Sequence, residues 1–154
     1  MTTIAWDAAS GVMAADTQCT SGNRKFRTSK VKRLKCGGLI GGSGSVAHML
    51  KVQRWAEGGF KLDEMPDFGD SGGDFEALIV KGDGSVYLLD EEMELMPFTD
   101  EFIAVGSGGP YAVAAMACGR TPAEAVEVAG RFDAATSGPV EVFKLTKPRG
   151  RKTR

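Results

Sequence analysis

The sequence predicts an α+β fold in which antiparallel sheets pack face to face and helices cover the outside of the sheets. Three observations favour this fold. Short apolar segments recur along the chain, and turn-forming residues separate them in the manner of hairpins. Helical spacing of apolar residues occurs in two separate places, over 45–57 and over 110–132. Since strands joined by tight turns pair antiparallel, the two helical clusters are expected on the outer faces of stacked sheets.

The N-terminal half is expected to form a two-stranded hairpin, a polar loop, a basic strand, a short buried strand and a helix. These segments cover, in order, 3–7 with 12–16, 17–27, 29–34, 39–42 and 45–57. In the basic strand Val31 and Arg33 would share one face. The stretch 58–74 is rich in glycine and has no period, which predicts a loop with one helical turn.

The C-terminal half is expected to form a hairpin, a buried strand, two helices and a closing strand. These segments cover 76–89, 102–106, 110–118, 121–132 and 140–145. The Asp83-Gly84 pair is the turn signal of the hairpin. Thr121 and Glu124 form a capping box around Pro122, which marks the start of the second helix.

The composition is that of an ordinary single-domain protein. The chain has 154 residues, 42% of them hydrophobic, and its net charge of −1 and pI near 5.9 provide no general attraction to nucleic acid. No apolar run approaches the roughly 20 residues that span a bilayer. We therefore predict one domain over 1–146 and a basic, flexible tail over 147–154, with no nucleic-acid or membrane partner. The three cysteines are widely spaced, which favours free thiols in a reducing cytoplasm.

Two glycine clusters each follow an expected strand and precede an expected helix. The first, Gly42-Ser43-Gly44-Ser45, matches a loose dinucleotide fingerprint, but the next strand belongs to a hairpin, whereas that cofactor needs a parallel strand. We expect this cluster instead to present free backbone N–H groups to a negatively charged oxygen. The second, Gly106-Ser107-Gly108-Gly109, is either a tight turn or a turn that projects Ser107 into a site.

Chemistry based on histidine is not expected. His48 is the single histidine and lies within the helical pattern of 45–57, where a structural role is the simplest interpretation. A metal site or a Ser-His-Asp triad would have to be built on that one residue, so no metal is expected. The carboxylates of Asp63-Glu64 and Asp90-Glu91-Glu92 are most simply solvated loop charge. An enzyme with this sequence would need its general base elsewhere.

The N-terminus offers such a base. Methionine before a small residue is commonly removed, which would leave Thr2 with a free α-amino group whose pKa is about 7.7–8.0. One residue would then carry a hydroxyl nucleophile and an amine that is partly neutral near pH 7. Lys30 is a candidate cation for the hydroxyl, and Asp16 is a candidate carboxylate to orient that cation. From the terminus alone, an ordinary start to a strand is the simpler interpretation.

Two blocks of the sequence carry a specific combination of residues. The first contains Thr2-Thr3-Ile4, Gly11, Ala15-Asp16-Thr17-Gln18, Thr20, Gly22-Asn23 and Lys30-Val31-Lys32-Arg33-Leu34. The second is Ala104-Val105-Gly106-Ser107-Gly108-Gly109-Pro110-Tyr111-Ala112. Together they resemble the HslV and proteasome β-subunit family of threonine peptidases, which are N-terminal-nucleophile hydrolases. This resemblance implies a four-layer αββα sandwich of two antiparallel sheets.

The resemblance also implies a role for each matched residue. Thr2 would be the nucleophile and, through its amine, the base, while Lys30 would lower the pKa of the threonine hydroxyl and Asp16 would orient the lysine. Ser107 would lie close to the terminal amine. Asp133 and Ser137, spaced one residue further apart than is usual in the family, would support the site. The positions that bind the oxyanion and the substrate would be Gly42, Gly44, Ser45, Thr20, Cys19 and Val46.

The function that the resemblance implies is that of an N-terminal threonine endopeptidase, cytoplasmic, acting on protein or peptide substrates. The chain would form a homo-oligomer of stacked rings and work with an AAA+ unfoldase of HslU type. That partner ATPase would use the ATP, and peptide hydrolysis itself would need no cofactor. Two alternatives stay open: a catalytically inactive assembly subunit of the same fold, and an N-terminal-nucleophile amidohydrolase that acts on small amides.

Two regions depart from the family pattern or lie outside it. The family usually has a second long helix after the first, whereas this chain has the short stretch 58–74, which leaves the contacts of that region with other subunits and with an ATPase open. The basic residues between Lys144 and Arg154 are either a solvated end or a docking segment for a partner.

Overall fold

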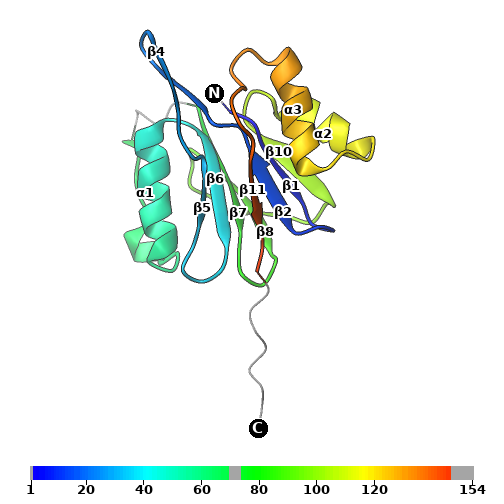
Figure 1. Cartoon of the computed structure of the whole chain (residues 1–154). Helices are drawn as coiled ribbons and strands as arrows, with labels where there is room; N and C mark the ends of the chain where they lie inside the picture. The colour runs from blue at the N-terminus through cyan, green and yellow to red at the C-terminus, as the bar shows by residue number, and fades with distance from the viewer. Residues whose placement is uncertain (1, 70–73, 147–154) are drawn as a thin grey trace.

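The protein, as a computed structural model describing residues 2–69 and 74–146, has four layers (Figure 1). A helix, a five-stranded sheet, a four-stranded sheet and a pair of helices follow one another across the molecule. Neighbouring strands in both sheets are antiparallel. The predicted α+β sandwich with helices on the outside is therefore confirmed. The predicted tail over 147–154 lies outside the described residues.

The four-stranded sheet brings together the two ends of the described chain. Its order is β10-β1-β2-β11, with β1 (Ile4–Asp7), β2 (Val12–Ala15), β10 (Phe102–Val105) and β11 (Glu141–Lys144). Ile4 lies opposite Ala15 of β2 and opposite Val105 of β10. This register brings the residues just before β1 beside those just after β2 and β10, and the candidate site is built at that edge.

The five-stranded sheet has the order β5-β6-β7-β8-β9. Its strands are β5 (Val31–Arg33), β6 (Leu39–Gly44), β7 (Phe75–Val80), β8 (Val86–Asp90) and β9 (Met96–Phe98). A separate two-stranded sheet consists of β3 (Gln18–Ser21) and β4 (Arg24–Arg27), and this hairpin projects from the body of the molecule (Figure 1).

Three helices cover the sheets. α1 (Val46–Glu57) begins at Ser45, whose side chain accepts a hydrogen bond from the backbone of His48. α2 (Gly109–Ala117) and α3 (Pro122–Phe132) form the other outer layer. The predicted capping box of α3 is confirmed, since the Thr121 side chain accepts from Glu124 N and the Glu124 carboxylate accepts from Thr121 N. A single turn of 3₁₀ helix, η1 (Leu62–Glu64), lies in the predicted loop over 58–74.

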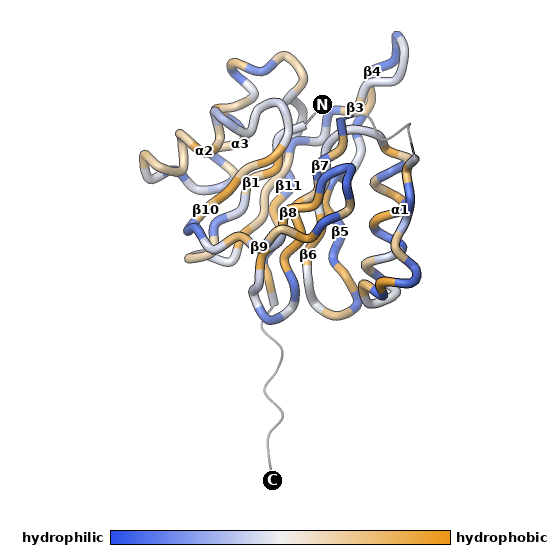
Figure 2. The backbone as a smooth tube through the Cα atoms, turned by 180° about the vertical axis from the view of Figure 1, so that it is seen from behind, coloured by the Kyte–Doolittle hydropathy of each residue, from blue (hydrophilic) through white to orange (hydrophobic). Residues whose placement is uncertain are grey.

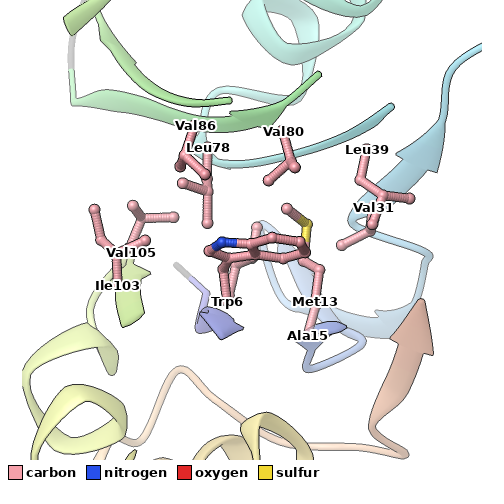
Figure 3. Packing of buried hydrophobic residues seen from close by; sticks show 11 residues of the cluster. Trp6, Met13, Ala15, Val31, Leu39, Leu78, Val80, Val86, Ile103 and Val105 are labelled. Carbon is pink, nitrogen blue, oxygen red and sulfur yellow. The ribbon is translucent and has the colours of Figure 1, made fainter. Parts of the chain in front are cut away.

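Three apolar cores hold the four layers together. Figure 3 shows the central core, in which Trp6 and Met13 of the four-stranded sheet point toward Leu78 and Val80 of the five-stranded sheet. A second core lies between α1 and the five-stranded sheet, and a third, rich in alanine, lies between the four-stranded sheet and α2 with α3. Within the described ranges no helix has both the length and the apolar character needed to cross a membrane.

The predicted polar loop over 17–27 is wrong, because this segment folds into the β3–β4 hairpin. Cys19 pairs with Phe26 and Thr20 with Lys25 across its ladder. The turn depends on Gly22, whose φ of 56° is one that residues with a β-carbon rarely adopt. The strands bury little apolar surface, so the alternation that reveals most strands is missing here.

Three smaller features go beyond the sequence expectations. Arg33 shares one face of β5 with the buried Val31 but is itself exposed, and its guanidinium donates to the carbonyl of Lys144 at 2.8 Å. β9 was not predicted, since it contains Pro97, and proline is tolerated there because β9 is an edge strand. Phe132, at the end of α3, is exposed and stacks on Tyr111.

Leu78→Ala should lower the free energy of unfolding by about 2–5 kcal/mol, because it leaves a cavity between the two sheets. Leu62→Ala is the matched control, since Leu62 is 81% exposed, and it should change stability by less than about 0.5 kcal/mol. Urea unfolding followed by circular dichroism measures both values. Equal losses in the two variants would contradict the central core described above.

Candidate active site

A buried ion pair lies at the edge where β1 begins and β2 ends. Lys30 Nζ donates to both carboxylate oxygens of Asp16, at 2.9 and 3.0 Å, and both side chains are more than nine-tenths buried. Asp16 directly follows β2, and Lys30 directly precedes β5. The structure thus brings together two residues that the sequence predicted as partners.

The Asp16 carboxylate is fully hydrogen bonded. Besides Lys30, it accepts the backbone N–H groups of Thr3 at 2.9 Å, Gln18 at 3.3 Å and Ser137 at 3.2 Å. These backbone donors fix the position of the carboxylate, and the carboxylate in turn fixes the position of the Lys30 ammonium group. The lysine is therefore held in one place.

A cleft of about 170 Å³ opens over Thr2 and Lys30. Thr2 is only 4% exposed, so its side chain lies in the wall of this cleft rather than on the open surface. Residues of β3, the end of β6 and the first turns of α1 complete the lining. The cleft brings together seven predicted site residues, namely Thr2, Lys30, Gly42, Gly44, Thr20, Cys19 and Val46.

The glycine segment 42–44 is the end of a strand, not the free turn that the sequence suggested. β6 continues through Gly44 and pairs with β7 on one side. On the other side, β5 begins at Val31, opposite Gly41, so among the described residues the backbone of 42–44 has no partner strand there. This open edge lines the cleft and offers backbone N–H and C=O groups to a bound molecule. Ser45 does not line the cleft; it caps α1.

Two exposed apolar residues of α1 line the cleft: Val46, which the resemblance placed among the substrate-binding positions, and Leu50, which it did not include. Val46 is 58% exposed and Leu50 is 50% exposed, and Met49 beside them contributes to both the cleft and the core under α1. Helical spacing alone does not distinguish an apolar face that packs on a sheet from one that lines a groove. His48 lies on the buried side of α1, where its ring stacks on Phe68, which agrees with the structural role predicted for it.

The second glycine turn packs directly against Thr2. Gly106 has a φ of 89°, and a β-carbon at this position would overlap the carbonyl oxygen of Thr2. The same carbonyl oxygen accepts from Gly108 N at 3.4 Å, and Gly106 N donates to the Glu76 carboxylate at 3.1 Å. Ser107 is thereby held beside the start of β1, although it does not line the main cleft.

A chain of hydroxyl groups links this turn to the start of β1. Ser107 Oγ donates to Asp133 Oδ2 at 2.7 Å, and Thr136 Oγ1 donates to the same oxygen at 2.6 Å. Because the proton of Thr136 is used in this way, the 2.6 Å contact between the hydroxyls of Thr3 and Thr136 has Thr3 as its donor. Ser137, the other supporting residue considered, contacts Asp16 through its backbone and Gln18 through its hydroxyl.

The Asp133 carboxyl has a lowered pKa. Burial raises it, but the hydrogen bonds donated by Ser107 and Thr136, with help from Ala135 N, outweigh burial and bring the pKa below its ordinary value of 3.8. Sequence reasoning had included Asp133 but missed Thr3, Thr136 and Glu76. Spacing carries no signal for these contacts, since Thr3 and Thr136 are 133 residues apart. In the described part of the chain no group of three His, Cys, Asp or Glu side chains is arranged to hold a metal.

The fold is that of the N-terminal-nucleophile hydrolases. Known structures with a similar fold include eukaryotic HslV from Trypanosoma brucei, with a TM-score of 0.70, 20% identity and coverage of 92% of this chain and 99% of that one. BPH of Thiobacillus denitrificans in complex with epoxomicin is also similar, with a TM-score of 0.67, 20% identity and coverage of 94% and 99%.

The sequence comparison identifies the family. No family model matches the chain. The ATP-dependent protease subunit HslV of Petrotoga mobilis is 35% identical to it over 68% of either protein. The chain belongs to the HslV family.

Gly106→Ala should lower the free energy of unfolding more than Gly119→Ala does. Both glycines have a similar φ, 89° and 87°, so alanine costs about 1 kcal/mol of backbone strain at either position. Only at Gly106 would the added methyl group meet the Thr2 carbonyl, since Gly119 has open space around it. Denaturant unfolding of both variants gives the difference, and equal losses would contradict the close approach to Thr2.

Asp133→Asn should lower stability in a pH-dependent way. A carboxyl whose pKa is lowered by folding stabilises the native state at pH values above 3.8, and this contribution is lost as the pH falls below that value. The stability difference between wild type and Asp133→Asn should therefore be constant from about pH 5 upward and shrink on acidification. Asp63→Asn, at an exposed position, should show little difference at any pH. A pH-independent difference for Asp133→Asn would contradict the hydrogen-bonded carboxylate.

Proposed function

We propose that this chain is the proteolytic subunit of an ATP-dependent protease and that Thr2 is its nucleophile. The observation that carries the proposal is a buried Thr2 that lines one cleft with Lys30, whose charge is held by Asp16. Membership of the HslV family supports the same function, since the Petrotoga mobilis relative is an ATP-dependent protease subunit.

The chemistry requires Thr2 to be the first residue of the mature protein. Its neutral α-amine then accepts the hydroxyl proton while Thr2 Oγ forms a bond to the carbonyl carbon of a peptide. The Lys30 ammonium favours the developing alkoxide. The carbonyl oxygen becomes an oxyanion, and backbone N–H groups at the open edge of residues 42–44 are suited to stabilise it.

Collapse of this intermediate breaks the peptide C–N bond. The protonated amine of Thr2 gives its proton to the leaving nitrogen, and the acyl group remains on Thr2 Oγ as an ester. A water molecule then attacks the ester while the amine of Thr2 accepts a proton from that water. The C–O bond to Thr2 Oγ breaks, the amine returns the proton to Thr2 Oγ, and the acid product leaves. Ser107 lies in the glycine turn that packs on Thr2, and its hydroxyl is hydrogen bonded to Asp133. It is therefore suited to orient the amine of Thr2.

The cleft is suited to an extended peptide. The open edge of β6 can pair with a substrate backbone in the manner of an added strand, with Thr20 on the facing wall. Cys19, Val46 and Leu50 give the cleft an apolar wall that fits an uncharged side chain next to the cleaved bond.

The remaining parts of the proposal concern the assembly. We propose that copies of the chain form stacked rings in the cytoplasm and receive unfolded protein from an AAA+ unfoldase of HslU type. In this assembly the partner ATPase uses the ATP, and the chain described here cleaves peptide bonds without a cofactor.

Thr2→Ala should abolish hydrolysis of a fluorogenic peptide, because it removes the nucleophile while leaving the backbone unchanged. Thr2→Ser should retain partial activity, and Thr99→Ala, at an exposed threonine remote from the cleft, should behave as wild type.

Intact mass, measured first, should be that of the chain without Met1. An intact Met1 with no hydrolysis would favour an inactive assembly subunit, and hydrolysis of small amides but not of peptides would favour an amidohydrolase. Equal activity of wild type and Thr2→Ala would refute the proposed nucleophile.

A further inference from the structure

Charged residues are segregated along the chain to a degree that the net charge of −1 conceals. Residues 17–56 include nine lysines and arginines and no acidic residue. Residues 82–119 include seven aspartates and glutamates and no lysine or arginine. Groups of one sign that fold onto one face produce a field that attracts a surface of the opposite sign.

Part of the basic stretch, together with Lys144, lies on one side of the molecule, which we call the basic flank. β5 and β11 lie side by side there, because Arg33 donates to the carbonyl of Lys144 and Ser29 Oγ donates to Glu141 at 2.6 Å. The β3–β4 hairpin extends from the same side (Figure 1). The basic flank consists of six exposed residues, Arg24, Lys25, Arg27, Lys32, Arg33 and Lys144.

The acidic stretch forms the opposite side, which we call the acidic flank. β9 is the far edge of the five-stranded sheet from β5, and β10 is the far edge of the four-stranded sheet from β11. Figure 2, seen from behind, accordingly has β9 and β10 in front, whereas Figure 1 has β11 in front. The acidic flank consists of six exposed residues around β9, Asp90, Glu91, Glu92, Glu94, Asp100 and Glu101.

The two flanks are largely unpartnered within the described residues. Of the basic flank only Lys32 has an ion pair there, with Glu57 at 3.7 Å, and no residue of the acidic flank has one. Each flank also carries apolar surface: Phe26 and Val142 are 47% and 55% exposed on the basic side, and Met96 is 55% exposed on the acidic side. Apolar residues surrounded by charge are typical of protein interfaces.

The β3–β4 hairpin connects the basic flank to the cleft over Thr2. It is a two-stranded sheet whose β4 residues are all exposed, and an isolated hairpin of this kind is at best marginally stable in water. Its β3 strand nevertheless supplies Cys19 and Thr20 to the cleft over Thr2. This wall of the cleft therefore depends on a further contact that keeps the hairpin in place.

We propose that the basic flank of one copy of the chain docks on the acidic flank of a second copy and that this contact fixes the β3–β4 hairpin. Because the two surfaces differ, the contact is head to tail, and a limited assembly results only if it closes into a ring. This deepens the proposed function, since it names the surfaces that form the ring and makes the substrate cleft dependent on assembly.

The test is a set of charge reversals whose molar mass is measured by light scattering after size exclusion. The hairpin reversal is Arg24→Glu/Lys25→Glu/Arg27→Glu, and the flank reversal is Glu91→Lys/Glu92→Lys/Glu94→Lys. Each alone should lower the molar mass well below that of the wild-type assembly, because like charges then face each other within the ring. A chain with both reversals should regain the wild-type mass, since the charges are again complementary.

The matched control reverses three basic residues of the α1 layer, Lys51→Glu/Arg54→Glu/Lys61→Glu, which are exposed and lie outside both flanks. It should keep the wild-type mass, and circular dichroism checks that every variant is folded. Wild-type mass in both single reversals, loss of assembly in the control, or no recovery in the double reversal would each overturn the proposal. A wild type that is monomeric at 0.1 M salt would overturn it as well.

Measurements of peptide hydrolysis distinguish a failure of the proposed interface from a failure of the proposed peptidase function. If Thr2→Ala assembles like wild type while the wild type cleaves no peptide, the peptidase function fails and the interface stands. If the wild type cleaves peptides and both single reversals keep its mass and activity, the interface fails and the peptidase function stands. Loss of hydrolysis in each single reversal, with recovery in the double reversal, is the result expected when the neighbouring copy fixes the cleft wall.

Discussion

The contact between Lys30 and Asp16 is the constraint on which the rest of the site depends. A buried ammonium group without its carboxylate costs several kcal/mol, so the two residues have to meet wherever the chain buries them. Asp16 also holds the backbones of Thr3 and Ser137, which come from the start and the end of the described chain. One carboxylate therefore joins the ends of the central strands β1 and β2, the segment that leads into the edge strand β11, and the start of β5 in the five-stranded sheet. The position of Thr2 follows from that tie.

The outer helices contribute to the site through short turns rather than through their own side chains. The turn before α2 packs on the Thr2 carbonyl, and the turn after α3 supplies Asp133 and Thr136. Hydroxyl groups and one carboxylate connect these turns to Thr3, so the start of β1 is fixed from the helical side as well as from the sheet side. Rigid support of this kind from several elements is what a reacting group needs to keep its orientation.

Much of this arrangement was predictable because it depends on local signals. The Asp83-Gly84 turn, the capping box at Thr121 and the apolar strands each reflect one short segment of sequence. The pairing of Asp16 with Lys30 was reached through resemblance to a family and through the chemistry that a threonine nucleophile requires. The catalytic roles of Thr2 and of the other site residues stay predictions until activity is measured.

The features that could not be predicted depend on contacts between residues distant in sequence, or on surfaces whose sequence pattern fits more than one structure. β3 and β4 are polar, so they lack the alternation that indicates a strand. The bond between Thr3 and Thr136 leaves no trace in spacing. Leu50 has the periodicity of a core residue although it lines a groove, because water-facing apolar walls and buried ones look alike in sequence.

Pro97 on the edge strand β9 affects how molecules of this protein can associate with one another. An edge strand with all its N–H groups free is a template on which further strands add without limit, and this is how fibrils grow. Proline lacks that donor, so β9 cannot offer a complete ladder to another chain. Contact at this side is thereby left to side chains, which form a finite and reversible association instead of an endless sheet.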